Sequence, residues 1–154
     1  MSNEGEQGMT KHWLPLTYEP KIEAVFDGSC TQSIRPGWKR QVGDYVGYHL
    51  WEGLPYRSKW GRRTKLMEIV ETTDITVFQE ILIINKWMNY YWYHPVCFDK
   101  IYRWNHELTD RIAKQDHINP PTGIALRDVL KSFYGELNGQ KMQIIRWNPE
   151  MVIE

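Results

Sequence analysis

The sequence lacks the features that mark disulfide-rich proteins and transmembrane proteins. It holds two cysteines in 154 residues, Cys30 and Cys97, which are too few for a disulfide framework. Its longest apolar stretch, residues 75–98, is interrupted by polar and charged side chains, among them Glu80 and Lys86. Both would lie in hydrocarbon if this stretch crossed a membrane, at a high cost in free energy. We therefore expect a cytoplasmic protein with no membrane partner.

The sequence also lacks an excess charge and the common catalytic motifs. Lys plus Arg and Asp plus Glu both number 19, so the formal net charge is zero, which argues against a globally basic nucleic-acid binder. There is no Walker loop, no GxGxxG and no GxSxG, so nucleotide hydrolysis, dinucleotide redox chemistry and serine-hydrolase chemistry have no support. His94 and Cys97 are metal-ligand types, but no second pair with matching spacing accompanies them. We expect no metal and no cofactor.

Aromatic residues, in contrast, are abundant. Hydrophobic residues make up 42% of the chain and charged residues 25%, which is enough for a buried core. Eight Trp and nine Tyr are more than a core of this size needs. We expect some of these rings to line a groove or a surface.

Local signals predict the order of the elements. Residues 1–10 are polar and indicate a disordered lead-in, followed by a single domain over residues 11–154. Strands are expected at residues 12–18, 31–35, 45–51, 65–72, 75–84 and 142–147. Helices are expected from Glu19 to a stop at Gly28, from a cap at Asn105 to near residue 119, and from Thr122 to a stop at Gly135. The aromatic block at residues 87–93 fits helix and strand templates equally.

These elements predict an α+β fold. The strands do not alternate with helices as in a doubly wound sheet. A small, mostly antiparallel β-barrel of five or six strands, with about three short helices at its openings, fits the pattern best.

One third of the chain is basic. Residues 31–65 carry a formal charge of +6 and the rest of the chain carries −6. Aromatic residues are interleaved with these cations, among them Trp38, Trp51, Tyr56 and Trp60. Nucleic-acid binding needs this combination, because cations neutralise phosphates and flat rings stack on unpaired bases. The alternative is a solvated basic loop whose Trp side chains pack inward.

Several segments resemble a known family. Residues 26–35 (FDGSCTQSIR) resemble the helix-Gly-x-Lys-Thr-x-Thr-x-Arg signature of ASCH domains, which are members of the PUA-like superfamily. Val42-Gly43-Asp44 is similar to the family's Gly-Asp turn, and residues 53–60 (GLPYRSKW) are similar to a Pro-Tyr-Arg-Ser segment of some members. The resemblance covers residues 12–147, with an unusual aromatic insertion near residues 86–104.

The resemblance implies a PUA-like β-barrel whose cleft receives RNA or a modified nucleoside. The signature segment and the basic loop would line this cleft. The candidate nucleic-acid-binding residues are Thr31, Arg35, Lys39, Arg40, Tyr56, Arg57, Lys59, Trp60, Arg62 and Arg63.

A hydrolase is the first alternative to a binding protein. Some small bacterial members of the family hydrolyse the amide of acetylated cytidine with a Lys, a Thr and a Glu. By position these fall on Cys30, Ser33 and Asp116. A thiol cannot supply the positive charge of the lysine, so Cys30 is either a thiolate nucleophile or, as we favour, a small buried residue. Such an enzyme would act on a modified nucleoside or, as a ribonuclease, on RNA.

A protein-interaction module is the second alternative. The aromatic insertion would then dock a partner or a second copy of the chain. We expect a monomer, with a dimer through this insertion as the other outcome.

Overall fold

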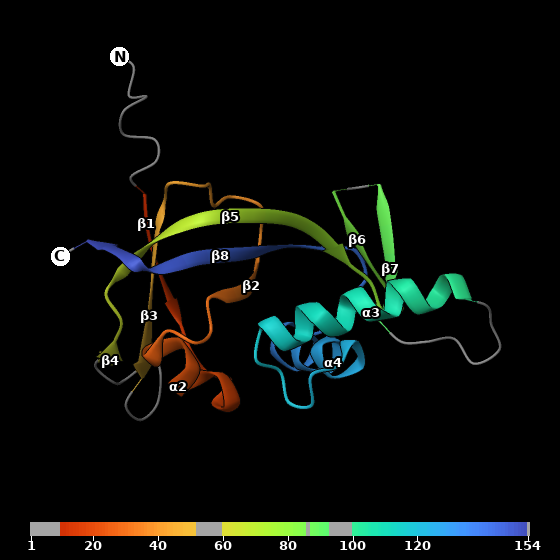
Figure 1. The fold of residues 1–154 in the computed structure, drawn as a ribbon, viewed down its shortest axis with the longest axis horizontal. Coiled ribbons are helices and arrows are strands. Elements are labelled where there is room, and N and C mark those ends of the chain that lie inside the picture. Colours follow the sequence, from red (N-terminus) through yellow and green to blue (C-terminus); the bar gives the residue numbers. More distant parts are fainter. Residues whose placement is uncertain (1–9, 52–59, 86, 93–99, 154) are drawn as a thin grey trace, which may run out of the picture. The chain divides into compact units, whose positions relative to one another are not determined.

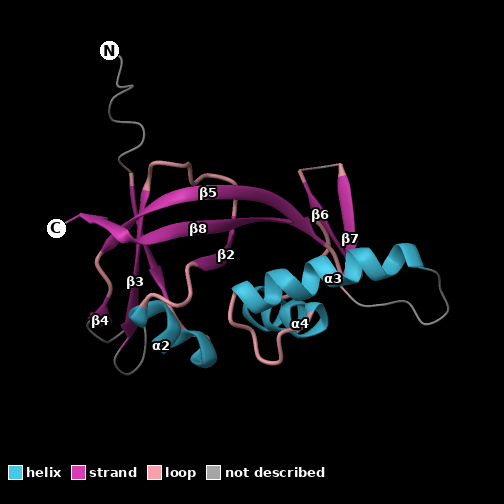
Figure 2. Ribbon diagram, in the orientation of Figure 1, coloured by secondary structure: helices cyan, strands magenta, loops and turns pink. Residues whose placement is uncertain are grey.

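The structure is a computed structural model that describes residues 10–51, 60–85, 87–92 and 100–153 (Figure 1). This part of the chain forms three helices and eight strands, distinguished by colour in Figure 2. In chain order they are β1 (Lys11–Pro15), α2 (Glu19–Asp27), β2 (Gln32–Pro36), β3 (Tyr45–Trp51), β4 (Trp60–Arg63), β5 (Leu66–Val77), β6 (Ile81–Ile84), β7 (Met88–Tyr91), α3 (Lys100–Gln115), α4 (Gly123–Tyr134) and β8 (Gln140–Ile153). The expected α+β class is confirmed, and the expected lead-in lies almost wholly outside the described residues.

The strands form an open, mostly antiparallel sheet. Its pairing runs β1-β3-β5-β6-β7, while β4 pairs with β3, and β8 pairs with β2 and β5. The β1–β3 pair is parallel, whereas β3–β4, β3–β5, β5–β6 and β6–β7 are antiparallel. The described strands number eight, not the expected five or six, and they do not form the closed barrel we expected. The two strands that the sequence did not predict, β4 and β7, are each four residues long, which is too short for alternation to reveal them.

The chain divides into two compact units. Unit 1 comprises residues 1–31, 39–72 and 145–154, and unit 2 comprises residues 32–38 and 73–144. Strands β5 and β8 contribute residues to both units.

The core of unit 1 is built on β3 and α2. Its buried residues are Leu16, Val25, Cys30, Val46, Tyr48, Met67, Ile69, Ile145 and Trp147. The ring of Tyr48 lies 5.0 Å from that of Trp147, centroid to centroid. Helix α2 adds Val25 to this core, with Ile22 and Phe26 packed beside it, which is the apolar face that the sequence predicts. Gly28 ends α2 with φ 88°, a left-handed cap that favours glycine.

Unit 2 holds the aromatic insertion. Trp92 is fully buried there, and its indole N–H donates to the carbonyl of Phe78 at 2.9 Å. The Thr109 hydroxyl of α3 donates to the carbonyl of Tyr91 at 3.0 Å, which connects the helix to the end of β7. The ambiguous aromatic block therefore contains a strand, at Met88–Tyr91, followed by a core tryptophan.

Several predicted boundaries are wrong, among them those of β5 and α3. Residues 65–72 and 75–84 were expected as separate strands, but β5 runs without a break from Leu66 to Val77, and a turn then separates it from β6. Helix α3 begins at Lys100, before the expected cap at Asn105. Tertiary pairing overrides local propensity at both places, because β5 gains partners along its length and α3 packs beside β7.

Candidate functional site

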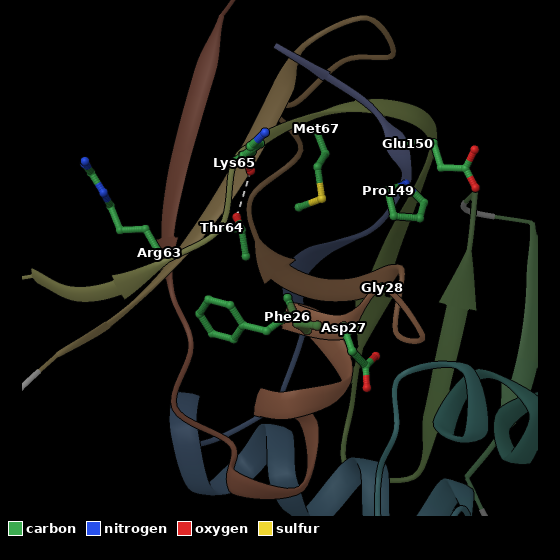
Figure 3. Close-up of a pocket in the computed structure, with 10 residues that line it drawn as sticks. Phe26, Asp27, Gly28, Arg63, Thr64, Lys65, Met67, Pro149 and Glu150 are labelled. Atoms are coloured by element: carbon green, nitrogen blue, oxygen red, sulfur yellow. Dashed lines mark hydrogen bonds between the residues drawn. The ribbon is translucent and has the colours of Figure 1, made fainter. Parts of the chain in front are cut away.

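A cavity of about 540 Å³ opens on unit 1 (Figure 3). It lies where the end of α2, the link from β4 to β5, and the C-terminal part of β8 meet. Its lining residues are Val25, Phe26, Asp27, Gly28, Arg63, Thr64, Lys65, Met67, Pro149 and Glu150. This volume is within the range of pockets that bind small molecules and cofactors.

Local hydrogen bonds fix the walls of the cavity. The Thr64 hydroxyl accepts from the backbone N–H of Tyr48 at 3.0 Å and donates to the carbonyl of Lys65 at 2.8 Å, which holds the link between β4 and β5. On the other wall, the Asp27 carboxylate accepts from the backbone N–H of Ser29 at 2.8 Å. This Asx-type turn fixes the loop that leaves α2.

The cavity has an apolar floor and a charged rim. Val25 and Met67 are buried at the floor, and Pro149 is half-buried beside them. Two cations, Arg63 and Lys65, are exposed at the rim. Two exposed carboxylates, those of Asp27 and Glu150, are also at the rim.

Two neighbouring arginines stack on aromatic rings. The Arg63 guanidinium lies 5.5 Å from the centroid of the Trp13 ring. The Arg62 guanidinium lies 3.9 Å from the centroid of Phe26 and donates to Glu23 at 2.7 Å. Stacking of this kind orders long basic side chains at a surface.

Cys30 lies in the core of unit 1. Its side chain is fully buried, and its backbone N–H donates to the carbonyl of Ala24 at 2.8 Å. A thiol without exposed surface offers no contact to a substrate in solution. The burial therefore favours the interpretation of Cys30 as a small core residue.

The two other candidate catalytic residues belong to unit 2. Ser33 is 1% exposed, and its hydroxyl accepts from Nε of Arg35 at 2.8 Å. Asp116, 5% exposed, follows the end of α3. Gln32 Nε2 donates to the carbonyl of Ile112 at 3.1 Å and lies 3.5 Å from Asp116 Oδ1. Gln32 thus connects β2 to the end of α3, a role that the sequence did not indicate.

The remaining predicted binding residues have different environments. Lys39 is exposed and Thr31 is half-buried, whereas Arg40 is 5% exposed, which points to a structural role for its guanidinium. Trp60 pairs with Trp51 at the start of β4, although its side chain lies outside the described part. Tyr56, Arg57 and Lys59 lie outside the described residues.

Six of the residues that line the cavity were neither predicted site residues nor part of the signature segment, residues 26–35. They are Val25, Thr64, Lys65, Met67, Pro149 and Glu150. Lys65 could have been predicted from the sequence, since it ends the basic run of residues 31–65. Pro149 and Glu150 had none, because only the folded chain brings β8 beside the end of α2.

Comparison of the chain with protein-family models, with curated proteins and with solved structures finds no match. Within the described residues, no three His, Cys, Asp or Glu side chains are grouped so that they could hold a metal ion. None of the described helices combines the length and the apolar character that a membrane span requires.

Proposed function

We propose that the chain is a cytoplasmic, ASCH-like protein of PUA-like fold that binds RNA, or a modified nucleoside, in the cavity of unit 1. The observation that carries the proposal is a nucleotide-sized cavity with Arg63 and Lys65 at its rim. The family relationship rests on the resemblance of residues 26–35, and the binding class rests on the cavity and its charges.

The chemistry of the cavity suits a nucleotide. Arg63 and Lys65 are exposed, so they would neutralise phosphates without a large desolvation cost. The floor of Val25 and Met67 would receive a base or a ribose, and the ring of Phe26 would stack on the base.

The direct test is a binding panel. Labelled single-stranded RNA, structured RNA and duplex DNA are titrated with the full chain at low and at moderate salt. Saturable binding of single-stranded RNA, weaker at the higher salt, is the expected result, because unpaired bases can enter a cavity and duplex bases cannot. Binding of none of the three would reject RNA as the ligand. An affinity for duplex DNA equal to that for single-stranded RNA would reject the role of the cavity.

The hydrolase alternative has less support. Two of its three candidate residues, Ser33 and Asp116, are in the same unit, but both are buried and the Ser33 hydroxyl is already bound to Arg35. We therefore favour binding over hydrolysis.

One observation favours the interaction-module alternative. Trp87, in the turn between β6 and β7, is 85% exposed, and the next residue, Met88, is 53% exposed. Exposed apolar side chains of this size are common at protein interfaces. Gel filtration of the full chain tests the self-association version, which a purely monomeric profile would reject.

A further inference from the structure

The charges at the rim of the cavity are sorted. Arg63 ends β4 and Lys65 follows it by two residues, whereas Asp27 ends α2 and Glu150 lies on β8. In Figure 3 the Arg63 side chain extends to the left of the view and the Glu150 carboxylate lies at the right. Met67 and Pro149 are drawn between them. Lys65 is drawn on the same side of Met67 as Arg63, and the Asp27 carboxylate is drawn on the side of Glu150, so the cations and the carboxylates lie on different sides of the floor in this view.

This arrangement disfavours a simple polyanion. Two phosphates in the cavity would bring one of them toward Asp27 or Glu150, where like charges repel. A ligand with a negative group at one end and hydrogen-bond donors at the other matches the rim. A nucleotide is such a ligand, provided that its base presents N–H groups.

We propose that the cavity prefers nucleotides whose base carries an exocyclic amine, guanine above all, over uracil. This inference rests on the proposed function. The phosphate lies toward Arg63 and Lys65, and the edge of the base lies toward Asp27 and Glu150. Ionised carboxylates only accept hydrogen bonds, so they require donors from the base.

The four bases differ in the donors that they offer. Guanine presents a ring N–H beside its amine, and one carboxylate can accept from both. Cytosine and adenine each present one amine, and carboxylate recognition of the cytosine amine is well established. Uracil presents a single N–H between two carbonyl oxygens, and a carboxylate repels both of these oxygens.

The two carboxylates can be neutralised with little change in shape. Asp27 accepts from the backbone N–H of Ser29, and asparagine retains an oxygen for this bond. The backbone N–H of Glu150 donates to the Asn148 side chain, a bond that Glu150→Gln leaves intact. The double variant Asp27→Asn/Glu150→Gln therefore removes two charges and preserves both turns.

The experiment uses single-stranded nonamers of RNA, one all uridine and three with guanosine, cytidine or adenosine at the three central positions. Fluorescence anisotropy measures their affinity for the native chain and for the double variant. The native chain is expected to bind the guanosine nonamer roughly 5- to 150-fold more tightly than the uridine nonamer, because a carboxylate–base contact discriminates by about 1–3 kcal/mol. In the double variant this preference falls to about twofold, and the uridine nonamer binds more tightly because two negative charges are gone.

A matched control uses a carboxylate outside the cavity. Glu71, which accepts from Arg146 at 2.7 Å, does not line the cavity, so Glu71→Gln should leave the base preference unchanged. Equal binding of the four nonamers by the native chain overturns the inference and leaves the proposed function in place. A guanosine preference that persists in the double variant also overturns the inference and leaves the proposed function in place. If the native chain binds none of the four nonamers, the proposed function is rejected as well.

Discussion

The guanidinium of Arg62 lies over the ring of Phe26, 3.9 Å from its centroid. The side chain of Arg62 is 50% exposed, so this contact orders a surface group without burying it. Phe26 lines the cavity of unit 1. Arg62 is thus placed to fix the ring that we propose stacks on a base.

Arg62→Ala should weaken binding of single-stranded RNA by up to about fivefold, since cation–π contacts at exposed sites contribute about 0.5–1 kcal/mol. Fluorescence anisotropy with the uridine and guanosine nonamers measures the change. Glu23→Gln is the control, because it removes the ion-pair partner of Arg62 and leaves the stacked pair in place. Native affinity in Arg62→Ala would show that neither the charge of Arg62 nor its contact with Phe26 contributes.

Cys30→Lys should destabilise the fold. The position is fully buried among apolar side chains, and a lysine there would be larger and would bury a charge. We expect a loss of about 3 kcal/mol or more in the free energy of unfolding, measured by urea denaturation. Cys30→Ala should cost less, because it only leaves a small cavity.

The same variant also tests the hydrolase alternative. A Cys30→Lys protein that is as stable as the native chain and gains amidase activity on acetylated cytidine would contradict the core interpretation of Cys30.

Gly47→Ala should destabilise unit 1. Trp13 of β1 pairs with Gly47 of β3, and a methyl group at Gly47 would lie 2.4 Å from the Trp13 ring. The ring must move, at a cost of about 1–3 kcal/mol. Thermal unfolding measures the loss, and in the double variant Trp13→Leu/Gly47→Ala the two effects should not add. Strict additivity would mean that the ring does not meet the new methyl group.

Gly123→Ala should destabilise unit 2. A methyl group there would lie 2.4 Å from both the Thr109 hydroxyl and the backbone carbonyl oxygen of Trp92. The carbonyl cannot turn aside as a flexible side chain can, so we expect a loss of about 1–3 kcal/mol in the free energy of unfolding. Ser132→Ala on the exposed side of the same helix is the control and should change stability by less than about 0.5 kcal/mol. Equal stability of the two variants would contradict the close approach at Gly123.

The elements that the sequence predicted well carry their signals locally. Helix α4 begins after Thr122, whose hydroxyl accepts from the N–H of Ala125 at 3.1 Å, and it ends before Gly135. Helix α2 has a proline in its first turn and ends at Gly28. Caps of this kind depend on three or four consecutive residues, so a sequence reveals them.

The features that the sequence did not reveal depend on distant contacts. The continuity of β5 results from pairing with β3 at one end and β6 at the other. Arg40, which we expected among the binding residues, is only 5% exposed, and no local pattern in the sequence indicated this burial. The cavity combines the end of α2 with Pro149 and Glu150 of β8, which no local pattern connects.

In the proposed function, Arg63 and Lys65 hold a phosphate of a bound RNA. The test is the salt dependence of single-stranded RNA binding for the native chain and for Arg63→Ala/Lys65→Ala. Lys131→Ala, at an exposed lysine of α4, is the charge control. We expect the double variant to bind more weakly, and the slope of log affinity against log salt to become shallower by about 0.7, which is the contribution of one neutralised phosphate on a single strand. Lys131→Ala should match the native chain. A double variant with native affinity and native slope would show that Arg63 and Lys65 do not hold a phosphate of the RNA.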